Sequence, residues 1–372
     1  MKIVITGGHL APALGLIDSL SKQDSVIFIG RKYALEGDKS LSLEYIEISK
    51  RNISFLALTT GRFQRNFSTQ TIPSLSRMPR AVLQATSYLR RIKPDVVLSF
   101  GGYLSVPVGL AAKILGIPLV IHEQTLEAGL ANKILTKIAT KICISWENSR
   151  SFFPEAKVVL TGNPLKKFIK SQYTPLFSAS DQNLPLLYVT GGSTGSHAIN
   201  KLIEEEVVEL TNSFCVVHQT GGAEEFSDYE RLVKIQASLP LENRKRYVVY
   251  KYISSEILGG ILESASIVFS RSGINTVSEL IFFGKPALLI PLPHGQKNEQ
   301  LKNARFLEEL GLAEVVLQKN ATAQVVSTKL LEMSSNLRRY KEAAREARGS
   351  LREDPAREIY ETLSYVVKKK SS

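Results

Sequence analysis

Residues 2–14 read KIVITGGHLAPAL, and residues 185–200 read PLLYVTGGSTGSHAIN. Both stretches run from an apolar segment into a threonine and a pair of glycines, and then into a segment that can begin a helix. A strand, a glycine turn and a helix form the first unit of a doubly wound α/β domain. We therefore predict two such domains, each beginning at one of these stretches.

Further short apolar segments alternate with helix-length segments along both halves of the chain. Continuous apolar strands separated by helices are typical of a parallel sheet that is covered on both faces. The predicted fold class is therefore α/β, with two Rossmann-like, doubly wound parallel-sheet domains. Because ligands bind beyond the carboxyl ends of such strands, we expect a cleft between the domains that both glycine turns line. The remaining predicted strands are residues 25–30, 53–58, 95–100, 118–122, 141–145, 158–162, 214–219, 247–250, 266–270, 286–291 and 313–317.

Strand signals lapse between residues 163 and 184, where Pro, Ser, Asn and Gln accumulate as they do in linkers. After residue 317 the pattern is helical and strongly charged, and the sequence finishes in KKKSS. We place a first domain at residues 1–165, a second at residues 166–350, and a helix with a basic tail at residues 351–372. This last helix is expected to pack back on the first domain.

The composition describes a globular protein with an anionic partner. Of the 372 residues, 44% are hydrophobic, and the formal net charge is +12. Such a charge attracts nucleic acid, phospholipid or a phosphorylated substrate. Cys143 and Cys215 are the only cysteines and lack a C-x-x-C spacing, so we expect a reducing compartment and no disulfide framework. No secretion signal or membrane span is expected, because the apolar stretches are interrupted by lysines and prolines.

The segment from Ile48 to Pro94 contains no Asp or Glu, whereas Lys and Arg recur throughout it. Apolar residues such as Leu75 and Val82 are interleaved with the basic ones, so the segment is amphipathic. Each Lys or Arg near anionic lipid contributes on the order of 1 kcal/mol, which favours reversible docking on an anionic membrane surface. No nucleic acid partner is expected, because no aromatic stacking platform or recognition-helix pattern accompanies the charge. The arginines assigned to this membrane patch are Arg62, Arg65, Arg77, Arg80, Arg90 and Arg91.

The second half offers two turns that can bind phosphate. The turn at residues 272–275 precedes Thr276-Val-Ser-Glu279, which has the S/T-x-x-E spacing of a capping box. Backbone N–H groups at such a helix start, together with the helix dipole, would hold a diphosphate. Glu279 either caps its own helix or accepts hydrogen bonds from a ribose diol. Glycine lacks a Cβ, so phosphate can also approach the backbone closely at Gly191, Gly192, Ser193 and Gly195.

In the first half, Gly101-Gly102-Tyr103 and His122-Glu123-Gln124 each follow a predicted strand. Both turns therefore fall on the carboxyl edge of the first sheet, near His9. An isolated histidine such as His122 or His218 is more often a core residue than a functional one. The chain has no H-x-x-x-H, H-E-x-x-H or D-x-D sequence, so we expect neither a metal site nor a cofactor.

Several longer motifs occur in order along nearly the whole chain. They are GGHLAPAL (7–14), FGGYLSVPVGLAAKILGIPLVIHEQ (100–124), TGNPL (161–165), VTGGSTGSHAIN (189–200), HQTG (218–221), RSGINTVSEL (271–280), GKPALLIPLP (284–293) and NEQLKNA (298–304). With these motifs the chain resembles the MurG-type family of bacterial transferases. The resemblance implies a two-Rossmann (GT-B) fold and an inverting, metal-independent transfer of N-acetylglucosamine from UDP-GlcNAc to undecaprenyl-diphospho-muramoyl-pentapeptide, which makes lipid II for peptidoglycan. It also implies a peripheral position on the cytoplasmic side of the cell membrane, with room for contacts to other cell-wall synthesis proteins.

The resemblance assigns roles to single residues. His9 would accept the proton of the muramoyl hydroxyl; if His9 only keeps its loop in shape, His122 or Glu123 is the next candidate base. The residues that would bind the donor are Thr125, Lys166, Ser193, Ile274, Asn275, Thr276, Glu279, Glu299 and Gln300. The loop for the acceptor diphosphate would comprise Thr6, Gly7, Gly8, Gly101, Gly102, Tyr103, His122 and Glu123.

The chain departs from the family pattern near both substrates. Its first glycine loop is T-G-G-H, which is shorter than the usual G-G-G-T-G-G-H. Thr125 stands where the family commonly has asparagine, Glu299 where it has glutamine, and Lys166 where it often has arginine. Because of these departures, the resemblance predicts the donor sugar less closely than it predicts the fold.

Two other classes of function stay open at this point. One is a different two-lobed UDP-sugar enzyme, either a lipid glycosyltransferase with another acceptor or a UDP-GlcNAc 2-epimerase, although the basic patch argues against a soluble epimerase. The other is a catalytically idle scaffold that uses the patch to hold RNA or membrane.

Overall fold

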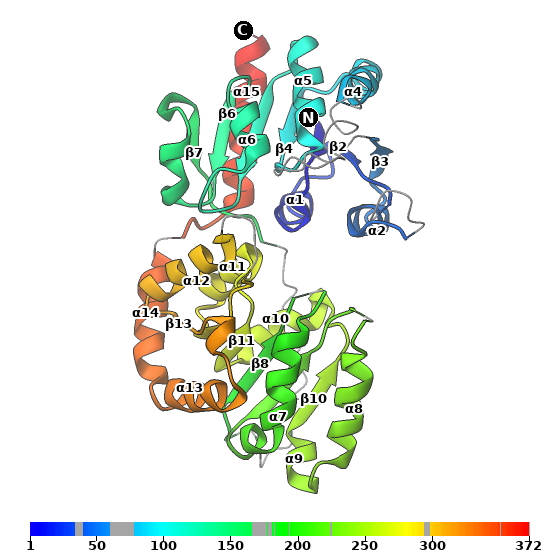
Figure 1. Cartoon of the computed structure of the whole chain (residues 1–372). Coiled ribbons are helices and arrows are strands. Elements are labelled where there is room, and N and C mark those ends of the chain that lie inside the picture. Colours follow the sequence, from blue (N-terminus) through cyan, green and yellow to red (C-terminus); the bar gives the residue numbers. More distant parts are fainter. Residues whose placement is uncertain are drawn as a thin grey trace. The chain divides into compact units, whose positions relative to one another are not determined.

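The computed structural model describes residues 1–33, 40–59, 78–165, 177, 181, 183–192, 194–223, 225–293, 298–349 and 351–371. The chain forms two compact units, one made of Met1–Lys167 with Arg352–Ser372 and the other of Phe168–Leu351 (Figure 1). Each unit contains one parallel sheet with helices around it, and each is described by itself.

The first unit contains a seven-stranded sheet in the order β3-β2-β1-β4-β5-β6-β7. All neighbouring strands are parallel. The strands are β1 (Lys2–Thr6), β2 (Ser25–Gly30), β3 (Ser54–Ala57), β4 (Val96–Ser99), β5 (Leu119–Glu123), β6 (Lys141–Ile144) and β7 (Val158–Leu160). The helices are α1 (Leu10–Ile17), α2 (Leu43–Lys50), α4 (Met78–Ile92), α5 (Ser105–Ile114), α6 (Leu130–Leu135), η1 (Glu147–Phe152), η2 (Glu155–Lys157) and α15 (Pro355–Ser371).

Helices cover this sheet on both faces because its strands are apolar at successive residues. Val4 of β1 faces a core that includes Leu89 of α4. Its neighbour Ile3 faces the opposite core, which includes Leu14 of α1 and Leu363 of α15. The alternation of a strand therefore places α4 and α5 on one face of the sheet and α1 and α15 on the other.

The second unit contains a six-stranded parallel sheet in the order β10-β9-β8-β11-β12-β13. Its core includes Leu187 of β8, Ile203 of α7 and Leu330 of α13. The strands are β8 (Leu186–Thr190), β9 (Cys215–Gln219), β10 (Tyr247–Tyr250), β11 (Ile267–Ser270), β12 (Ala287–Leu289) and β13 (Ala313–Val315). The helices are α7 (His197–Ser213), α8 (Asp228–Ser238), α9 (Leu241–Lys245), α10 (Ser255–Ser264), α11 (Ile274–Phe283), α12 (Glu299–Glu309), η4 (Gln318–Asn320), α13 (Ala323–Ser335) and α14 (Leu337–Gly349).

The predicted fold class is confirmed. Every predicted strand is present, and its bounds differ from the expected ones by at most two residues. Both sheets begin with the strand order 3-2-1-4-5-6, which is that of the doubly wound dinucleotide-binding fold. Within the described ranges, no helix combines the length and the apolar character that a membrane crossing requires.

Candidate active site

In each sheet the strand order reverses once, between β1 and β4 in the first unit and between β8 and β11 in the second. Connections leave these neighbouring strands in opposite directions, which opens a crevice beyond their carboxyl ends where ligands bind in doubly wound folds. The predicted glycine turns follow these four strands. The fold therefore places the turns at the two switch points.

The two glycine turns of the first unit pack on each other through their backbones. The N–H of Gly8 donates to the carbonyl of Gly101 at 2.9 Å, and the N–H of Phe100 donates to the carbonyl of Thr6 at 2.8 Å. A Cβ on Gly102, whose φ is +79°, would lie 2.7 Å from the nitrogen of Gly8. These glycines are required by the close approach of one turn to the other, so the Gly8 amide is engaged within the protein.

His9 lies at the start of α1, directly after this turn. It is the N-cap residue of the helix, with φ −105° and ψ 91°, but its side chain makes no capping hydrogen bond. The imidazole Cδ2 is 3.6 Å from the position of a Cβ on Gly101. Burial lowers the pKa of His9 below its usual value, and the negative charge of Glu123 opposes this shift. His9 is therefore a neutral imidazole at neutral pH, which a general base requires.

Glu123 is buried at the end of β5, and both of its carboxylate oxygens accept hydrogen bonds. One oxygen accepts from the N–H and the hydroxyl of Thr125, at 3.1 and 2.6 Å. The other accepts from the N–H of Gly129 at 2.8 Å and the carboxamide of Asn132 at 3.0 Å. Glu123 thus orders the loop between β5 and α6, which is a structural role. The Thr125 hydroxyl also contacts the carbonyl of Glu127, so its hydrogen is already engaged in this loop.

His122 is a buried, neutral core histidine on the same strand. Its Nε2 lies 3.1 Å from the carbonyl of Gly162 and donates to it, and burial lowers its pKa to about 4. The Nδ1 lone pair has no hydrogen-bond partner among the described residues. Such buried groups cost about 1–3 kcal/mol unless a ligand or water satisfies them. Three further buried polar atoms at this carboxyl edge also lack a hydrogen-bond partner among the described residues, namely Thr6 Oγ1, Gln124 Oε1 and Asn132 Oδ1.

In the second unit, the turn after β8 is held by Gln219 from the neighbouring strand. The Gln219 carboxamide donates to the carbonyl of Gly192 at 3.1 Å and accepts from the N–H of Ile253 at 3.0 Å. A Cβ on Gly191 would lie 2.2 Å from the nitrogen of Ser196, whereas nothing lies within 4 Å of a Cβ placed on Gly192. The turn is therefore tightly packed on one side and open on the other. Ser193 and Lys166 lie outside the described residues.

The turn after β11 leads directly into α11, and the predicted capping box is wrong. The helix begins at Ile274 with Gly273 as its N-cap, and no side chain caps it. Thr276 is thus the third helical residue and cannot be the cap, because the N-cap position is taken by Gly273, three residues before Thr276. The first N–H groups of a helix have no acceptor within it, so those of Ile274, Asn275 and Thr276 are available to a ligand. Nothing lies within 4 Å of a Cβ placed on Gly273, so the turn has open space beside it.

Glu279 lies in the second turn of α11 and is half-buried. Its negative charge contributes, after burial, to a raised pKa of Tyr188 on β8, which places the carboxylate near the switch point of this sheet. Because the helix is capped by Gly273, the structure excludes the interpretation that Glu279 caps its own helix.

Residues that the sequence reasoning did not single out tie these loops together. Arg271 donates to the hydroxyl of Ser196 at 3.0 Å and to the carbonyl of Ile290 at 3.0 Å. The Ser272 hydroxyl donates to the carbonyl of Gln300 at 2.7 Å, and the Asn303 carboxamide donates to the carbonyl of Ser272 at 3.0 Å. Arg271 and Ser272 stand in the motif RSGIN, but a local pattern does not reveal partners so distant in sequence.

Gln300 and Glu299 begin α12 next to this turn. The Gln300 carboxamide oxygen accepts from the N–H of Leu292 at 3.0 Å, and Glu299 is the first residue of the helix. The structure thus brings α11 and the start of α12 together at one switch point. Thr125, predicted beside the donor sugar, belongs to the first unit.

Three arginines of the predicted membrane patch lie on α4, and the other three lie outside the described residues. Ala81, Ala85 and Leu89 form the buried side of α4. The opposite side carries Leu83, which is 70% exposed, and exposed basic residues. The exposed arginines are Arg80, Arg90 and Arg91, whereas Arg62, Arg65 and Arg77 are the undescribed ones.

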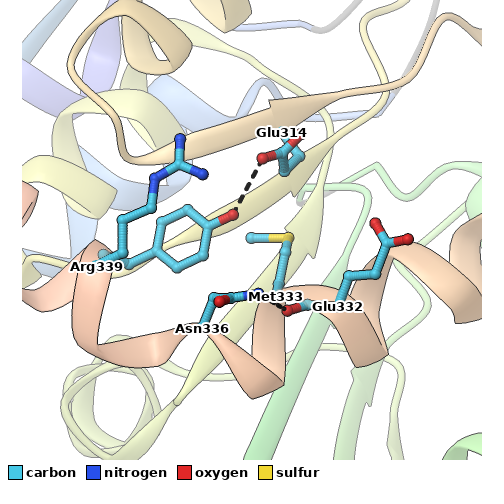
Figure 2. A pocket seen from close by; sticks show the side chains of 6 residues that line it. Glu314, Glu332, Met333, Asn336 and Arg339 are labelled. Atoms are coloured by element: carbon cyan, nitrogen blue, oxygen red, sulfur yellow. Dashed lines mark hydrogen bonds between the residues drawn. The ribbon is translucent and has the colours of Figure 1, made fainter.

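The second unit also has a pocket between β13, α13 and α14 (Figure 2). There the Tyr340 hydroxyl donates to the Glu314 carboxylate at 3.1 Å. No predicted site residue lines this pocket, so it is not part of the candidate active site. Within the described part of the chain, no three His, Cys, Asp or Glu side chains gather where they could hold a metal ion.

Two family models match the chain: the glycosyltransferase family 28 N-terminal domain at residues 4–144 and the corresponding C-terminal domain at residues 186–362. Among solved structures, the chain is similar to Acinetobacter baumannii MurG, with a TM-score of 0.72 and 24% identity over 98% of this chain and 99% of that one. It is also similar to the UDP-GlcNAc 2-epimerase from Neisseria meningitidis, with a TM-score of 0.63 and 17% identity over 98% and 100%. These matches define a two-domain glycosyltransferase of the GT-B fold.

Proteins that are similar in sequence show which kind of glycosyltransferase the chain is. A Treponema denticola protein named UDP-N-acetylglucosamine–N-acetylmuramyl-(pentapeptide) pyrophosphoryl-undecaprenol N-acetylglucosamine transferase is 33% identical over 84% of this chain and 82% of its own length. A Bacillus cereus protein of the same name, numbered 1, is 31% identical over 98% of each chain. The chain therefore belongs to this MurG family of transferases.

Proposed function

We propose that the protein transfers N-acetylglucosamine from UDP-GlcNAc to undecaprenyl-diphospho-muramoyl-pentapeptide, which converts lipid I into lipid II in peptidoglycan synthesis. The observation that carries this proposal is that the sequence similarity extends over almost the whole chain: a relative with this named activity is 31% identical over 98% of it. The glycine turns at the carboxyl edges of the two sheets support the proposal, because a transferase must bind both a donor and an acceptor.

The donor is proposed to bind the second unit with its diphosphate at the start of α11. The available N–H groups of Ile274, Asn275 and Thr276 and the helix dipole both favour an anion there. Glu279 would accept hydrogen bonds from the ribose diol, and Glu299 and Gln300 would contact the sugar. Lys166, Ser193 and Thr125 complete the proposed donor set.

The acceptor is proposed to bind the first unit, with its diphosphate at the glycine turns and the start of α1. His9 would take the proton from the muramoyl hydroxyl as the hydroxyl oxygen attacks C1 of the donor sugar. The bond between C1 and the UDP oxygen breaks with inversion at C1, and its electron pair leaves with UDP. The N–H groups of α11 would stabilise the charge that develops on the diphosphate, so the proposed reaction needs no metal ion.

The arginine face of α4 is proposed to dock the protein on the cytoplasmic side of the cell membrane, where the lipid acceptor lies. Arg80, Arg90 and Arg91 are exposed on the same helix as the exposed Leu83, and this combination suits an interface between anionic headgroups and acyl chains. Other cell-wall synthesis proteins are proposed as neighbours there.

One assay tests the proposal. Purified protein is given UDP-GlcNAc and a short-chain lipid I analogue, with UDP-glucose and UDP-GalNAc in parallel reactions and a chelator in a further one. We expect a β-linked disaccharide product from UDP-GlcNAc, unchanged by the chelator. Formation of UDP-ManNAc without an acceptor would instead identify an epimerase, and no reaction with any donor would favour the scaffold.

A further inference from the structure

Arg271 lies at the carboxyl edge of the second sheet, directly after β11. Its Nε donates to the hydroxyl of Ser196 at 3.0 Å, and its Nη1 donates to the carbonyls of Ile290 and Pro291 at 3.0 and 3.4 Å. Ser196 is the N-cap of α7, and the two carbonyls follow β12. The guanidinium group therefore connects the ends of β11 and β12 with the start of α7.

This guanidinium group is close to two helix starts that follow glycine turns. The turn after β8 packs on Ser196, because a Cβ on Gly191 would lie 2.2 Å from the Ser196 nitrogen. Helix α11 begins at Ile274, three residues after Arg271. The N–H groups at the start of a helix favour an anion, and a full positive charge a few ångströms away adds to their effect.

The charge of Arg271 has no acidic partner. Its three acceptors are neutral, and no Asp or Glu of the described residues forms an ion pair with it. Two other half-buried arginines of this unit differ in this respect: Arg231 donates to Glu204 and Arg246 donates to Asp181, each at 2.7 Å. Burial lowers the pKa of Arg271 below its usual range, but arginine keeps its proton in a protein. A half-buried cation without an acidic partner is unfavourable unless an anion binds beside it.

We propose that Arg271 is a positioning residue for the diphosphate of the donor. It holds the start of α7 beside the turn that leads into α11, and it supplies a full positive charge where the helix starts supply only N–H dipoles. The inference rests on the proposed binding of the donor to the second unit, and it adds a cation to the N–H groups proposed there.

The test compares the binding of UDP and uridine to the full chain by isothermal titration calorimetry. The two ligands differ only by the diphosphate, so the ratio of the Kd for uridine to the Kd for UDP measures its contribution. Arg271→Gln removes the charge and should reduce this ratio about tenfold to a hundredfold, as expected for loss of a charged group. The Kd for uridine should stay unchanged, which also shows that the variant is folded. An equal weakening of both ligands, or an unchanged Kd for UDP, would overturn the inference.

Arg271→Lys separates the charge from the planar arrangement of hydrogen-bond donors. An ammonium group keeps the positive charge but lacks the guanidinium fork. This variant should therefore prefer UDP more strongly than Arg271→Gln does. A lysine variant with the same low ratio as the glutamine variant would overturn the role of the charge.

Lys285 provides a matched control in the same unit. It is also half-buried, burial lowers its pKa, and its ammonium group donates to the carbonyl of Glu263 at 2.7 Å. Because Lys285 precedes β12, it lies at the amino edge of the sheet, away from both helix starts. Lys285→Gln should change the ratio less than about twofold, since distant charges are screened. An equal fall in this control would overturn the inference, because net charge alone would then explain it.

The wild type separates failure of the inference from failure of the proposed function. If the wild type binds UDP no more tightly than uridine, the proposed donor site is wrong. If the wild type prefers UDP and Arg271→Gln keeps the whole preference, the donor site stands and the inference about Arg271 alone is wrong.

Discussion

Replacing His9 by alanine separates its proposed catalytic role from a role in shaping the loop. A positioned general base contributes about 10²–10⁴ to the rate, so kcat should fall by that factor while the Kd for UDP-GlcNAc is preserved. Stability should change little, because the His9 side chain makes no capping hydrogen bond on α1. The assays are steady-state kinetics with the lipid I analogue, donor titration and thermal unfolding.

Thr322→Ala supplies the matched control. The Thr322 side chain caps α13 by accepting from the N–H of Val325 at 3.2 Å, so its loss should cost about 1 kcal/mol of stability without affecting kcat. In wild type, kcat/KM should fall only below the usual histidine pKa of about 6.5, because burial lowers the pKa of His9. His9→Ala should lack this acid limb. A variant that keeps its kcat but melts at lower temperature would refute the base assignment.

Three further predictions follow from the same structure. Glu279→Gln should raise the KM for UDP-GlcNAc by about ten- to a hundredfold, because a charged hydrogen bond is lost; an unaltered KM would leave no ribose role for Glu279. Changing Arg80, Arg90 and Arg91 to glutamine should abolish sedimentation with anionic vesicles yet preserve turnover of a soluble acceptor, and equal binding of wild type to neutral vesicles would contradict this. Burial lowers the pKa of His218 to about 3, so the unfolded chain binds the proton first and stability should fall by about 2 kcal/mol from this residue as the pH drops from 7 to 5; urea unfolding of His218→Asn should show a correspondingly smaller loss.

The strands could be predicted from sequence because both faces of each sheet are covered. Residues 3–5 and 215–217, for example, are continuously apolar, and this pattern marks buried parallel strands wherever it occurs. The glycine turns could also be placed, since the carboxyl ends of parallel strands share one edge. The first residue of the helix after each turn could not be predicted as well, and Thr276 shows why. Its capping-box spacing is a local signal, but the start of α11 is set by Gly273, which follows the strand more closely.

The hydrogen bonds that hold the site together could not be predicted in this way. Arg271 reaches Ser196, which is 75 residues away in sequence, and Gln219 reaches across from a neighbouring strand to Gly192. Such partners are determined by which strands are adjacent in the sheet. The hydrogen bonds of Glu123 could not be predicted for the same reason. In sequence Glu123 is a candidate catalytic base, whereas in the structure it accepts hydrogen bonds from Thr125 and Gly129 of the loop after β5 and from Asn132 of α6.

The two carboxyl edges differ in the hydrogen-bonding groups that they leave for a ligand, and this difference supports the proposed division of substrates. The second unit presents N–H donors, because α11 begins at an open glycine without a side-chain cap. In the first unit the Gly8 amide is instead engaged by the carbonyl of Gly101. Backbone N–H donors suit the anionic diphosphate of a nucleotide. The start of α11 is therefore a better match for the diphosphate of UDP-GlcNAc than the glycine turns of the first unit, where the acceptor diphosphate would rely on the N–H groups at the start of α1.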